Sequence, residues 1–443
     1  MAHEELFARH FESMTGRYAD AIGSLSRDKI LIDAVLIHSG SEGVYFADDQ
    51  HMPFRSFAHF LQWLPVDRPD QMILFQPGKK PTYFQVVPKD FWYEQSVVVE
   101  EWWAQHFDIV PLSSADEVID QLPPLRRIAF LGESTGFAAT LGLPSSLHNE
   151  PRLRSFLDYH RAVKTEYEVE RIREASVLGV DGHRAAREKF EKAGSEWDIH
   201  MAFLETCRIT EFESPYPNIV ALDEKGAILH YQNRRTASGR GSKVLLIDAG
   251  CRVAGYCSDI TRTYTRDGAS PVFKALIDGV EKIELGLVPE VKAGRPYPEL
   301  HAEAHRRIAA LLRDTGLCTA SVEEMVTTNI TNLFFPHGLG HLLGIQVHDV
   351  GGHFKDDTGA LAPPPDEYKY LRLTRPIEVG MVFTIEPGFY FIPTLLDAER
   401  ESDKGKALNW KLIDELTPLG GIRIEDNILV TNDGARNLTR GAS

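Results

Sequence analysis

The sequence predicts two domains: an α/β domain over residues 1–160 and an α+β domain over residues 161–443. Three observations support this prediction. A chain of 443 residues exceeds the size at which one hydrophobic core keeps growing. Up to about residue 160, short apolar runs alternate with helix signals, a pattern typical of a small α/β domain. Beyond that point long helical stretches begin, and the C-terminal part is mostly short strands separated by loops.

The first domain contains four short apolar runs, each bounded by turns that contain proline or glycine. Such runs predict β-strands. They cover residues 34–38, 72–75, 83–87 and 128–131. A charged segment precedes the first of them, so we expect a helix or coil followed by a small sheet.

The second domain opens with two helix-start signals. Thr165 and Glu168 fit a capping box, and apolar residues then recur at helical spacing up to Phe190. Ser195 with Asp198 predicts the start of a second helix. Two longer helices are predicted over residues 271–287 and 298–312.

The remainder of the second domain predicts strands and two loops. The strands cover residues 218–222, 227–231, 244–249, 256–264, 382–386 and 422–430. Two polar, proline-rich segments, 353–375 and 394–420, predict long loops, which in compact domains are usually functional or mobile.

Composition limits the classes of function. The net charge of −16 disfavours a nucleic-acid partner. No apolar run reaches the roughly 18 residues that a membrane span needs, and the charged N-terminus lacks the apolar core of a signal peptide. Four cysteines without a CxxC pair favour reduced thiols in a cytosol. We therefore expect a cytoplasmic protein with no nucleic-acid or membrane partner.

Five side chains of the second domain are candidate metal ligands: Asp248, Asp259, His341, Glu386 and Glu425. All but the histidine lie in apolar runs that predict strands. Unpaired charges on a buried sheet face are costly, and converging carboxylates also repel one another. Two divalent cations would remove both problems. The carboxylates and single imidazole form a hard ligand set, which suits Mn²⁺ first, with Co²⁺, Fe²⁺ and Zn²⁺ as alternatives.

The spacing of the two aspartates predicts their geometry. If residues 244–264 form one antiparallel hairpin, Asp248 and Asp259 are directly opposed on one face, roughly 5 Å apart at Cβ. The alternative is two exposed aspartates, which the neighbouring apolar side chains disfavour. Arg423 shares a face with Glu425 and is a candidate to hold the metal-bound carboxylates, with a plain Arg–Glu pair as the alternative.

Histidines fall into two groups. His337, His341 and His348 lie within twelve residues of a glycine-rich loop, and this clustering favours chemistry over a structural role. His301 and His305 have the i,i+4 spacing that zinc sites use, but the metalloprotease glutamate is absent. Their charged neighbours predict a partly solvated helix face, so we expect a structural role.

Five motifs carry the candidate ligands: IDAG, SDITRTY, PHGLGH, TIEPG and GGIRIEDN. In this order and spacing they resemble the pita-bread metallopeptidases of family M24, which include methionine aminopeptidase, aminopeptidase P and prolidase. The segments FADD, DFW, YPNIVAL and ILHY are similar to the bacterial Xaa-Pro dipeptidase (prolidase) branch, which includes the organophosphorus acid anhydrolases. The resemblance covers essentially the whole chain. It implies a pita-bread second domain with a curved, mostly antiparallel sheet.

The resemblance also implies residue roles. Asp259 and Glu425 would bridge two metal ions per subunit, Asp248 would complete one, and His341 and Glu386 the other. The implied catalytic residues are His348, Glu386 and His337. The implied substrate-binding residues are His230, Tyr216, Tyr297, Leu371, Arg375, Arg423, Asp49 and Trp92. Asp49 and Trp92 would act from the partner subunit of a homodimer.

Arg375 is the candidate that would stop the substrate at its C-terminal carboxylate, because a guanidinium matches a carboxylate bidentately. The alternative is an ordinary surface arginine. After the ligand histidine this chain has Leu342 and Leu343, where it departs from the family pattern, so the fine substrate preference stays open.

The resulting hypothesis is an Xaa-Pro dipeptidase that uses a dinuclear metal-bound hydroxide. His348 would stabilise the oxyanion and Glu386 would carry the proton to the departing proline nitrogen. Side hydrolysis of organophosphorus esters or fluorides is plausible on the same site. Two alternatives stay open: an aminopeptidase P acting on longer X-Pro peptides, and a metal-free binding homologue without catalysis.

Overall fold

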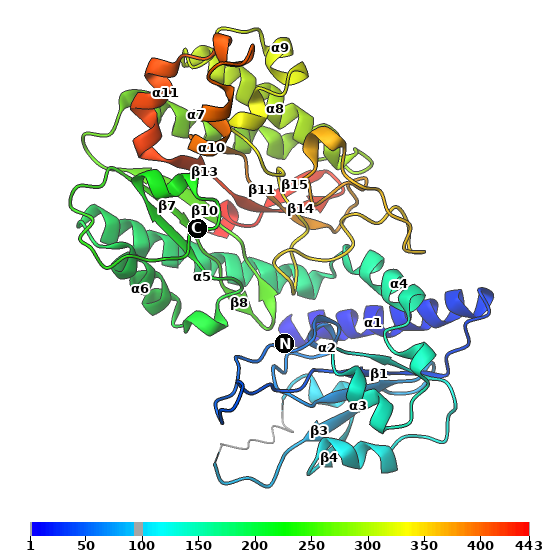
Figure 1. The fold of residues 1–443 in the computed structure, drawn as a ribbon. Helices are drawn as coiled ribbons and strands as arrows, with labels where there is room; N and C mark the ends of the chain where they lie inside the picture. Colours follow the sequence, from blue (N-terminus) through cyan, green and yellow to red (C-terminus); the bar gives the residue numbers. More distant parts are fainter. Residues whose placement is uncertain (1, 93–100, 443) are drawn as a thin grey trace. The chain divides into compact units, whose positions relative to one another are not determined.

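The computed structural model describes residues 2–92 and 101–442, and the chain divides into two compact units (Figure 1). The first comprises Met1–Arg161, Thr165–Glu168 and Phe354–Ala360. The second comprises Ala162–Lys164, Val169–His353 and Leu361–Ser443. Segment 354–360 therefore joins the first unit from far along the chain, which the sequence did not indicate.

The first unit is built on a five-stranded mixed sheet in the order β4-β3-β2-β1-β5. Its strands are β1 (Ala34–His38), β2 (Met72–Phe75), β3 (Thr82–Val86), β4 (Asp108–Leu112) and β5 (Ile128–Leu131). Its longer helices are α1 (Ala2–Arg27), α2 (Ala58–Trp63), α3 (Thr135–Thr140) and α4 (Pro151–Arg161). The four predicted strands are confirmed. β4 was missed because most of its side chains are exposed or half-buried, so it lacks an apolar run.

The second unit contains the remaining elements, and all its strand pairs are antiparallel. Its helices are α5 (Glu166–Glu191, whose first turn belongs to the first unit), α6 (Glu196–Cys207), α7 (Pro271–Leu287), α8 (Tyr297–Asp314), α9 (Val322–Thr327), α10 (Pro393–Leu396) and α11 (Trp410–Leu416). Its strands are β6 (Ile219–Leu222), β7 (Val244–Asp248), β8 (Arg252–Val253), β9 (Tyr256–Cys257), β10 (Thr261–Thr265), β11 (Val382–Ile385), β12 (Gly388–Tyr390), β13 (Gly421–Arg423), β14 (Asp426–Thr431) and β15 (Gly434–Asn437).

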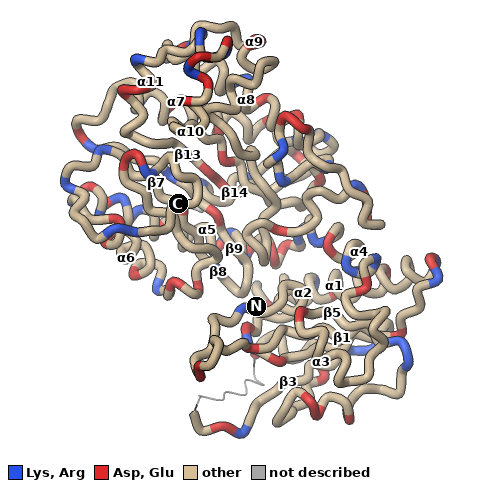
Figure 2. Tube along the Cα trace, viewed as in Figure 1, with Lys and Arg blue, Asp and Glu red and all other residues tan. Residues whose placement is uncertain are grey.

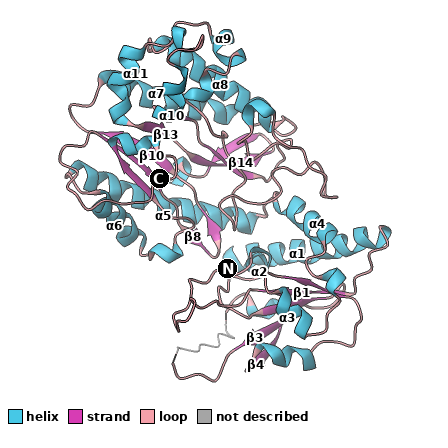
Figure 3. Cartoon of the chain, in the orientation of Figure 1, coloured by secondary structure: helices cyan, strands magenta, loops and turns pink. Residues whose placement is uncertain are grey.

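These strands lie between two layers of helices (Figure 3). On one side α5 and α6 pack against β6 and β7, through contacts such as Phe203 on Val220 and Leu245. On the other side α7 and α8 share a larger core with β11, β13 and β14, which includes Phe273 and Phe383. The sheet is therefore covered on both faces, and any carboxylate that points from it lies inside the unit.

Both predicted capping boxes are present. Glu168 Oε2 accepts a hydrogen bond from the backbone N–H of Thr165 at 2.8 Å, and the Glu168 N–H donates to Thr165 Oγ1. Ser195 and Asp198 make the same reciprocal pair at the start of α6. These bonds satisfy amide groups that a helix start leaves without partners.

Four sequence-based predictions for the second unit were wrong. Residues 227–231 form turns, closed by a bond from the Ile228 N–H to Lys225 O, in place of a strand. The predicted strand 256–264 is interrupted between β9 and β10, and the predicted strand 422–430 is interrupted between β13 and β14. The predicted loop 394–420 contains α11, which Asn409 caps through a bond from the Leu412 N–H, and which buries an apolar face on the core.

Figure 2 shows acidic and basic residues interspersed along both units. Among residues 2–92 and 101–442, every helix is too short or too polar to cross a bilayer.

The expectation of a solvated His301–His305 face was wrong. Both side chains are 1% exposed on the face of α8 that packs into the core. Their Nε2 atoms lie 3.2 Å apart, and His305 Nδ1 pairs with Thr331 Oγ1. The expected structural role fits this burial.

Candidate metal centre

One hairpin supplies both aspartates, but its predicted register was wrong. Asp248 ends β7 and is paired with Thr261, so it does not face Asp259 directly. Ala254 and Gly255 have φ values of 50° and 88° and form the two-residue turn that strand twist favours. This turn lies one residue later than predicted. Asp259 is consequently diagonal to Asp248, two residues beyond the paired position and on the same face.

The two glutamates come from neighbouring strands. Glu386 follows β11, and its N–H donates to Leu339 O at 2.8 Å. Glu425 lies between β13 and β14, where its N–H donates to Thr261 O at 3.0 Å. Thr261 Oγ1 in turn donates to Glu425 Oε2 at 2.6 Å. Thr261 therefore fixes Glu425 against the aspartate hairpin from both backbone and side chain.

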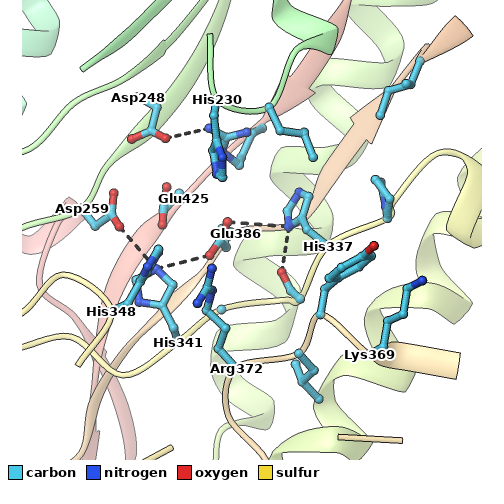
Figure 4. Close-up of a pocket in the computed structure, with 18 of the residues that line it drawn as sticks. His230, Asp248, Asp259, His337, His341, His348, Lys369, Arg372, Glu386 and Glu425 are labelled. Carbon is cyan, nitrogen blue, oxygen red and sulfur yellow. Dashed lines mark hydrogen bonds and ion pairs between the residues drawn. The ribbon is translucent and has the colours of Figure 1, made fainter. Parts of the chain in front are cut away.

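The glycine-rich loop brings His341 to the same place. A Cβ on Gly340 would lie 2.0 Å from Thr384 O, so only glycine lets the loop approach β11 this closely. His341 Nδ1 lies 3.0 Å from Leu342 O, and because a carbonyl only accepts, the proton is on Nδ1. His341 Nε2 then faces Asp259 Oδ2 at 3.4 Å and Glu386 Oε1 at 3.5 Å (Figure 4).

The five candidate ligands converge. Ligand atoms of Asp259, His341 and Glu425 lie within 4.8 Å of one another, and Asp248 and Glu386 line the same cavity. Burial raises the pKa of Asp248 to about 6 and that of Glu386 to about 7, and it raises the pKa of Glu425 well above its ordinary value. Burial is also the largest single influence on Asp259, but the hydrogen bond and charge of His341, together with the hydrogen bond from Tyr216, outweigh it and lower the pKa of Asp259.

Asp248 tests whether metal ions fit. Its Oδ1 is buried without a hydrogen-bond partner among the described residues, although a buried carboxylate oxygen normally has one. An orphaned oxygen, a bare imidazole nitrogen and three more carboxylates aimed at one point form a repulsive arrangement without cations. Hard divalent ions accept this donor set, so the residues fit such ions.

Arg423 and Tyr390 support the ligands from behind. The guanidinium of Arg423 donates to Asp248 Oδ2 at 2.7 Å, to Thr261 Oγ1 at 3.1 Å and to the Tyr390 hydroxyl at 2.7 Å. Tyr390 lies 2.9 Å from His337 Nε2. Tyr390 was not predicted as a site residue: it ends β12, a separate strand beyond Glu386, and no local pattern in the sequence singles it out.

Tyr216 and Tyr297 occupy different positions. The Tyr216 hydroxyl donates to Asp259 Oδ1 at 2.5 Å, so it contacts a candidate ligand. Tyr297 is fully buried, and its hydroxyl donates to Thr384 O at 3.2 Å, beneath the loop of Gly340. Of these two predicted pocket residues, Tyr216 alone reaches the centre directly.

A cavity of about 740 Å³ lies over the centre. Six of the predicted substrate-binding and catalytic residues line it: His230, His337, His348, Leu371, Glu386 and Arg423. The lining also includes residues that the sequence analysis did not single out, among them Leu229, Lys369, Tyr370, Arg372 and Ile392.

Arg375 is not among the residues that line this cavity. It is 2% exposed, and its guanidinium contacts Glu378. Arg372, three residues earlier, lines the cavity and points toward Glu386 and His348 in Figure 4. The predicted loop 353–375 thus contributes an arginine to the cavity, but that arginine is Arg372 and not Arg375.

His337 and His348 are neutral imidazoles. His337 Nδ1 lies 2.8 Å from Gly338 O, and burial lowers its pKa to about 3. The His348 ring lies 4.4 Å from the His341 ring at 81°, and burial lowers its pKa to about 3 as well. Neither imidazole therefore adds charge near neutral pH, and the N–H of His337 is donated to Gly338 O.

Asp49 and Trp92 belong to the first unit and are exposed. Trp92 is 76% exposed and packs on Phe91 with ring centroids 4.7 Å apart. Phe46 is fully exposed. Phe46, Phe91 and Trp92 are thus large apolar side chains left in water in this single chain, and apolar side chains that gather on a surface often mark an interaction site.

Two family models match the chain. Residues 170–432 match metallopeptidase family M24, and residues 5–159 match the N-terminal domain of Xaa-Pro dipeptidase. The Xaa-Pro dipeptidase of Pseudoalteromonas atlantica is 42% identical over 98% of both chains. That of Aeromonas hydrophila is 42% identical over 100% of this chain and 99% of the relative.

Solved structures share the fold. Aminopeptidase P from Escherichia coli, determined with the inhibitor Pro-Leu, superposes with a TM-score of 0.74 at 23% identity, over 99% of this chain and 95% of that one. The aminopeptidase PepP of Pseudomonas aeruginosa gives 0.72 at 22% identity with the same coverage. At this identity the likeness concerns the fold, which confirms the predicted two-part, pita-bread architecture.

Proposed function

The chain belongs to metallopeptidase family M24, and we propose that it is an Xaa-Pro dipeptidase, which hydrolyses dipeptides with a C-terminal proline. One observation carries the proposal: five metal-ligand side chains converge in a cavity of a chain that is 42% identical, end to end, to curated Xaa-Pro dipeptidases. We assign residues 1–160 to the N-terminal domain and residues 161–443 to the catalytic domain.

Family M24 implies divalent metal ions, and we propose that Asp248, Asp259, His341, Glu386 and Glu425 would hold two of them. Mn²⁺ is our first choice because oxygen donors dominate the set. When bound, the ions supply positive charge and a water of lowered pKa.

Glu386 is placed to carry the proton. Its carboxylate lines the cavity, and a carboxylate so placed can act first as a general base and then as a general acid. It also lies 3.7 Å from His337 Nδ1 at the edge of the cavity. We assign to Glu386 the transfer of a proton from the attacking water to the proline nitrogen. The departing proline nitrogen must gain a proton when the amide bond breaks, and in an Xaa-Pro bond it carries no hydrogen beforehand.

His348 orients the substrate as a neutral donor, and His337 lines the same cavity. We assign to His348 a hydrogen bond to the scissile carbonyl, because its ring lies beside His341 at the cavity floor. The chain of bonds from Arg423 through the Tyr390 hydroxyl fixes His337 in one tautomer. Donors held in advance of the reaction stabilise developing negative charge without reorganising.

Arg372 is the arginine that we propose for the substrate carboxylate. Arg375, the residue expected from the sequence, is occupied by Glu378 and stands outside the cavity lining. An end-stop that needs a free terminal carboxylate would make dipeptides better substrates than longer peptides. Leu371 and Leu229 add apolar surface that suits a proline ring and a nonpolar first residue.

A homodimer remains part of the proposal. The exposed fractions of Phe46, Phe91 and Trp92 are 100%, 85% and 76%, respectively, and a partner surface would remove these side chains from water. Asp49 and Trp92 would then reach the site of the partner subunit. Cytoplasmic location and organophosphorus hydrolysis stay predictions from the sequence.

The test is hydrolysis of Ala-Pro by metal-stripped enzyme that is reloaded separately with Mn²⁺, Co²⁺ and Zn²⁺. We expect turnover that depends on the metal and falls steeply from Ala-Pro to Ala-Pro-Ala. Equal rates on the tripeptide would favour the aminopeptidase P alternative. Absence of both metal uptake and turnover would favour the binding homologue.

A further inference from the structure

An ion pair that the catalytic assignments do not use lies beside the site. Lys164 Nζ donates to Asp349 Oδ2 at 2.9 Å, and each side chain is only 1% exposed. Desolvating two charges costs several kcal/mol per ion, and apolar replacements are often as stable. A pair buried this completely is therefore weak evidence for stability and invites another explanation.

Asp349 closes the loop that carries His348. Its N–H donates to Leu342 O at 2.9 Å, and this bond closes a loop of residues 343–348 that begins next to the candidate ligand His341. No described side chain hydrogen-bonds the His348 imidazole in this structure. The orientation of His348 consequently depends on how its backbone is held.

Lys164 is itself anchored to the strand before the centre. Its N–H donates to Gly380 O at 2.8 Å, and Val163 forms a bridge with Met381, which directly precedes β11. The ion pair thus connects the His348 loop to the strand that leads to Glu386. Both ends of this connection lie in the second unit.

Gly344 shows how tightly the pair is packed. A Cβ on Gly344 would lie 2.2 Å from Asp349 Oδ2 and 3.1 Å from Lys164 Cε. The loop therefore folds its own backbone over the ion pair, and the pair occupies the space that any larger residue at this position would need.

We propose that Lys164 and Asp349 are positioning residues, which hold His348 in the orientation that contacts the substrate carbonyl. The inference rests on the proposed dipeptidase function. A buried ion pair suits this task because it ties the His348 loop to Lys164, whose backbone is held on Gly380, so that moving the loop would separate two desolvated charges.

The test is a mutant cycle between Lys164→Met and His348→Ala, with kcat and KM measured on Ala-Pro at full metal load. We expect Lys164→Met to lower kcat about tenfold with little change in KM, because a displaced donor weakens mainly the transition state. In the His348→Ala background the same change should cost little further. An equal loss in both backgrounds, or no loss in either, would overturn the proposal.

Two further variants keep the outcome interpretable. If Lys164→Met fails to fold, the pair Lys164→Met with Asp349→Leu removes both charges of the ion pair together and should fold, but with the same loss of kcat. Lys406→Met is the matched control, since Lys406 pairs with Asp403 at 2.6 Å and both are exposed. It should leave kcat and KM unchanged.

A readout without catalysis separates this inference from the proposed function. With diamagnetic Zn²⁺ bound, the His348 Cε1 NMR signal, assigned by its loss in His348→Ala, should be sharp in the wild type and shifted or broadened in Lys164→Met. A wild type that fails to cleave Ala-Pro refutes the function alone. An unchanged His348 signal in Lys164→Met refutes the positioning.

Discussion

Glu284 on α7 provides a quantitative test of how the region behind the metal centre is held. Its side chain is fully buried, Oε1 has no partner among the described residues, and Oε2 lies 3.4 Å from Arg440 Nη2. Asp426, next to Glu425 in sequence, accepts bonds from Arg262, Arg440 and Asn437 and stays charged. Burial, together with the charge of Asp426, raises the pKa of Glu284 to about 9.

This pKa fixes the sign of a pH effect. Near pH 7 the folded protein keeps the Glu284 proton, whereas the unfolded chain, with an ordinary value of 4.5, has lost it. A raised pKa in the folded state contributes stability that is complete below 4.5 and is lost as pH rises toward 9. One retained proton corresponds to a loss of about 1.4 kcal/mol per pH unit between those limits.

Glu284→Gln removes this proton and preserves the shape, since an amide can donate to Asp426 and accept from Arg440. We expect the unfolding free energy of the variant, relative to the wild type, to rise by about 1.4 kcal/mol per pH unit from pH 5.5 to 7.5. Urea unfolding of both proteins in chelator measures it, because all other titrations cancel in the difference. Glu281→Gln, an exposed carboxylate on the same helix that also contacts Arg440, is the matched control and should lack the slope. A constant difference across this pH range would refute the reasoning.

The remaining predictions concern the centre and its pocket. Arg372→Ala should raise KM for Ala-Pro about 30-fold, by loss of about 2 kcal/mol of charge-assisted bonding, and should leave KM for Ala-Pro-amide unchanged. Arg375→Ala should leave KM unchanged for both substrates. The reverse pattern would restore the sequence-based assignment of Arg375. Glu386→Ala should abolish turnover, and a wild-type kcat in steady-state assays would remove its proton-transfer role. Gly340→Ala should lower metal content, measured by mass spectrometry, because its Cβ would overlap Thr384 O at 2.0 Å; full occupancy would contradict this. Chelation should lower the thermal midpoint, since ions that bind only the folded state stabilise it, and an unchanged midpoint would argue against a structural contribution of the ions.

Local patterns predicted the elements with strong signals. β1, β2 and β5 and helix α7 were located to the residue, because each combines a compact apolar pattern with turn or cap residues at its ends. β4 and α11 were missed for the opposite reason. β4 has few buried side chains, and α11 depends on one cap and a short apolar face.

The candidate ligands were also predictable, since buried carboxylates in apolar strands demand compensation. Their exact arrangement was not. The register of the Asp248 hairpin depends on a turn at Ala254 and Gly255, where one residue of error changes which side chains are opposed. The choice between Arg372 and Arg375 depends on how a proline-rich loop packs, which no periodic pattern encodes.

By itself, the amino-acid sequence determined the chemistry of this protein: which donors are available, that they are hard and acidic, and that they need cations. Tertiary structure alone decided which side chains meet. His348 lies beside His341, Tyr390 joins Arg423 to His337, and Lys164 neutralises Asp349 from 185 residues away. The physical reason is range. Propensity, capping and burial act on neighbours in the chain, whereas a site is a set of contacts between distant segments that only packing brings together.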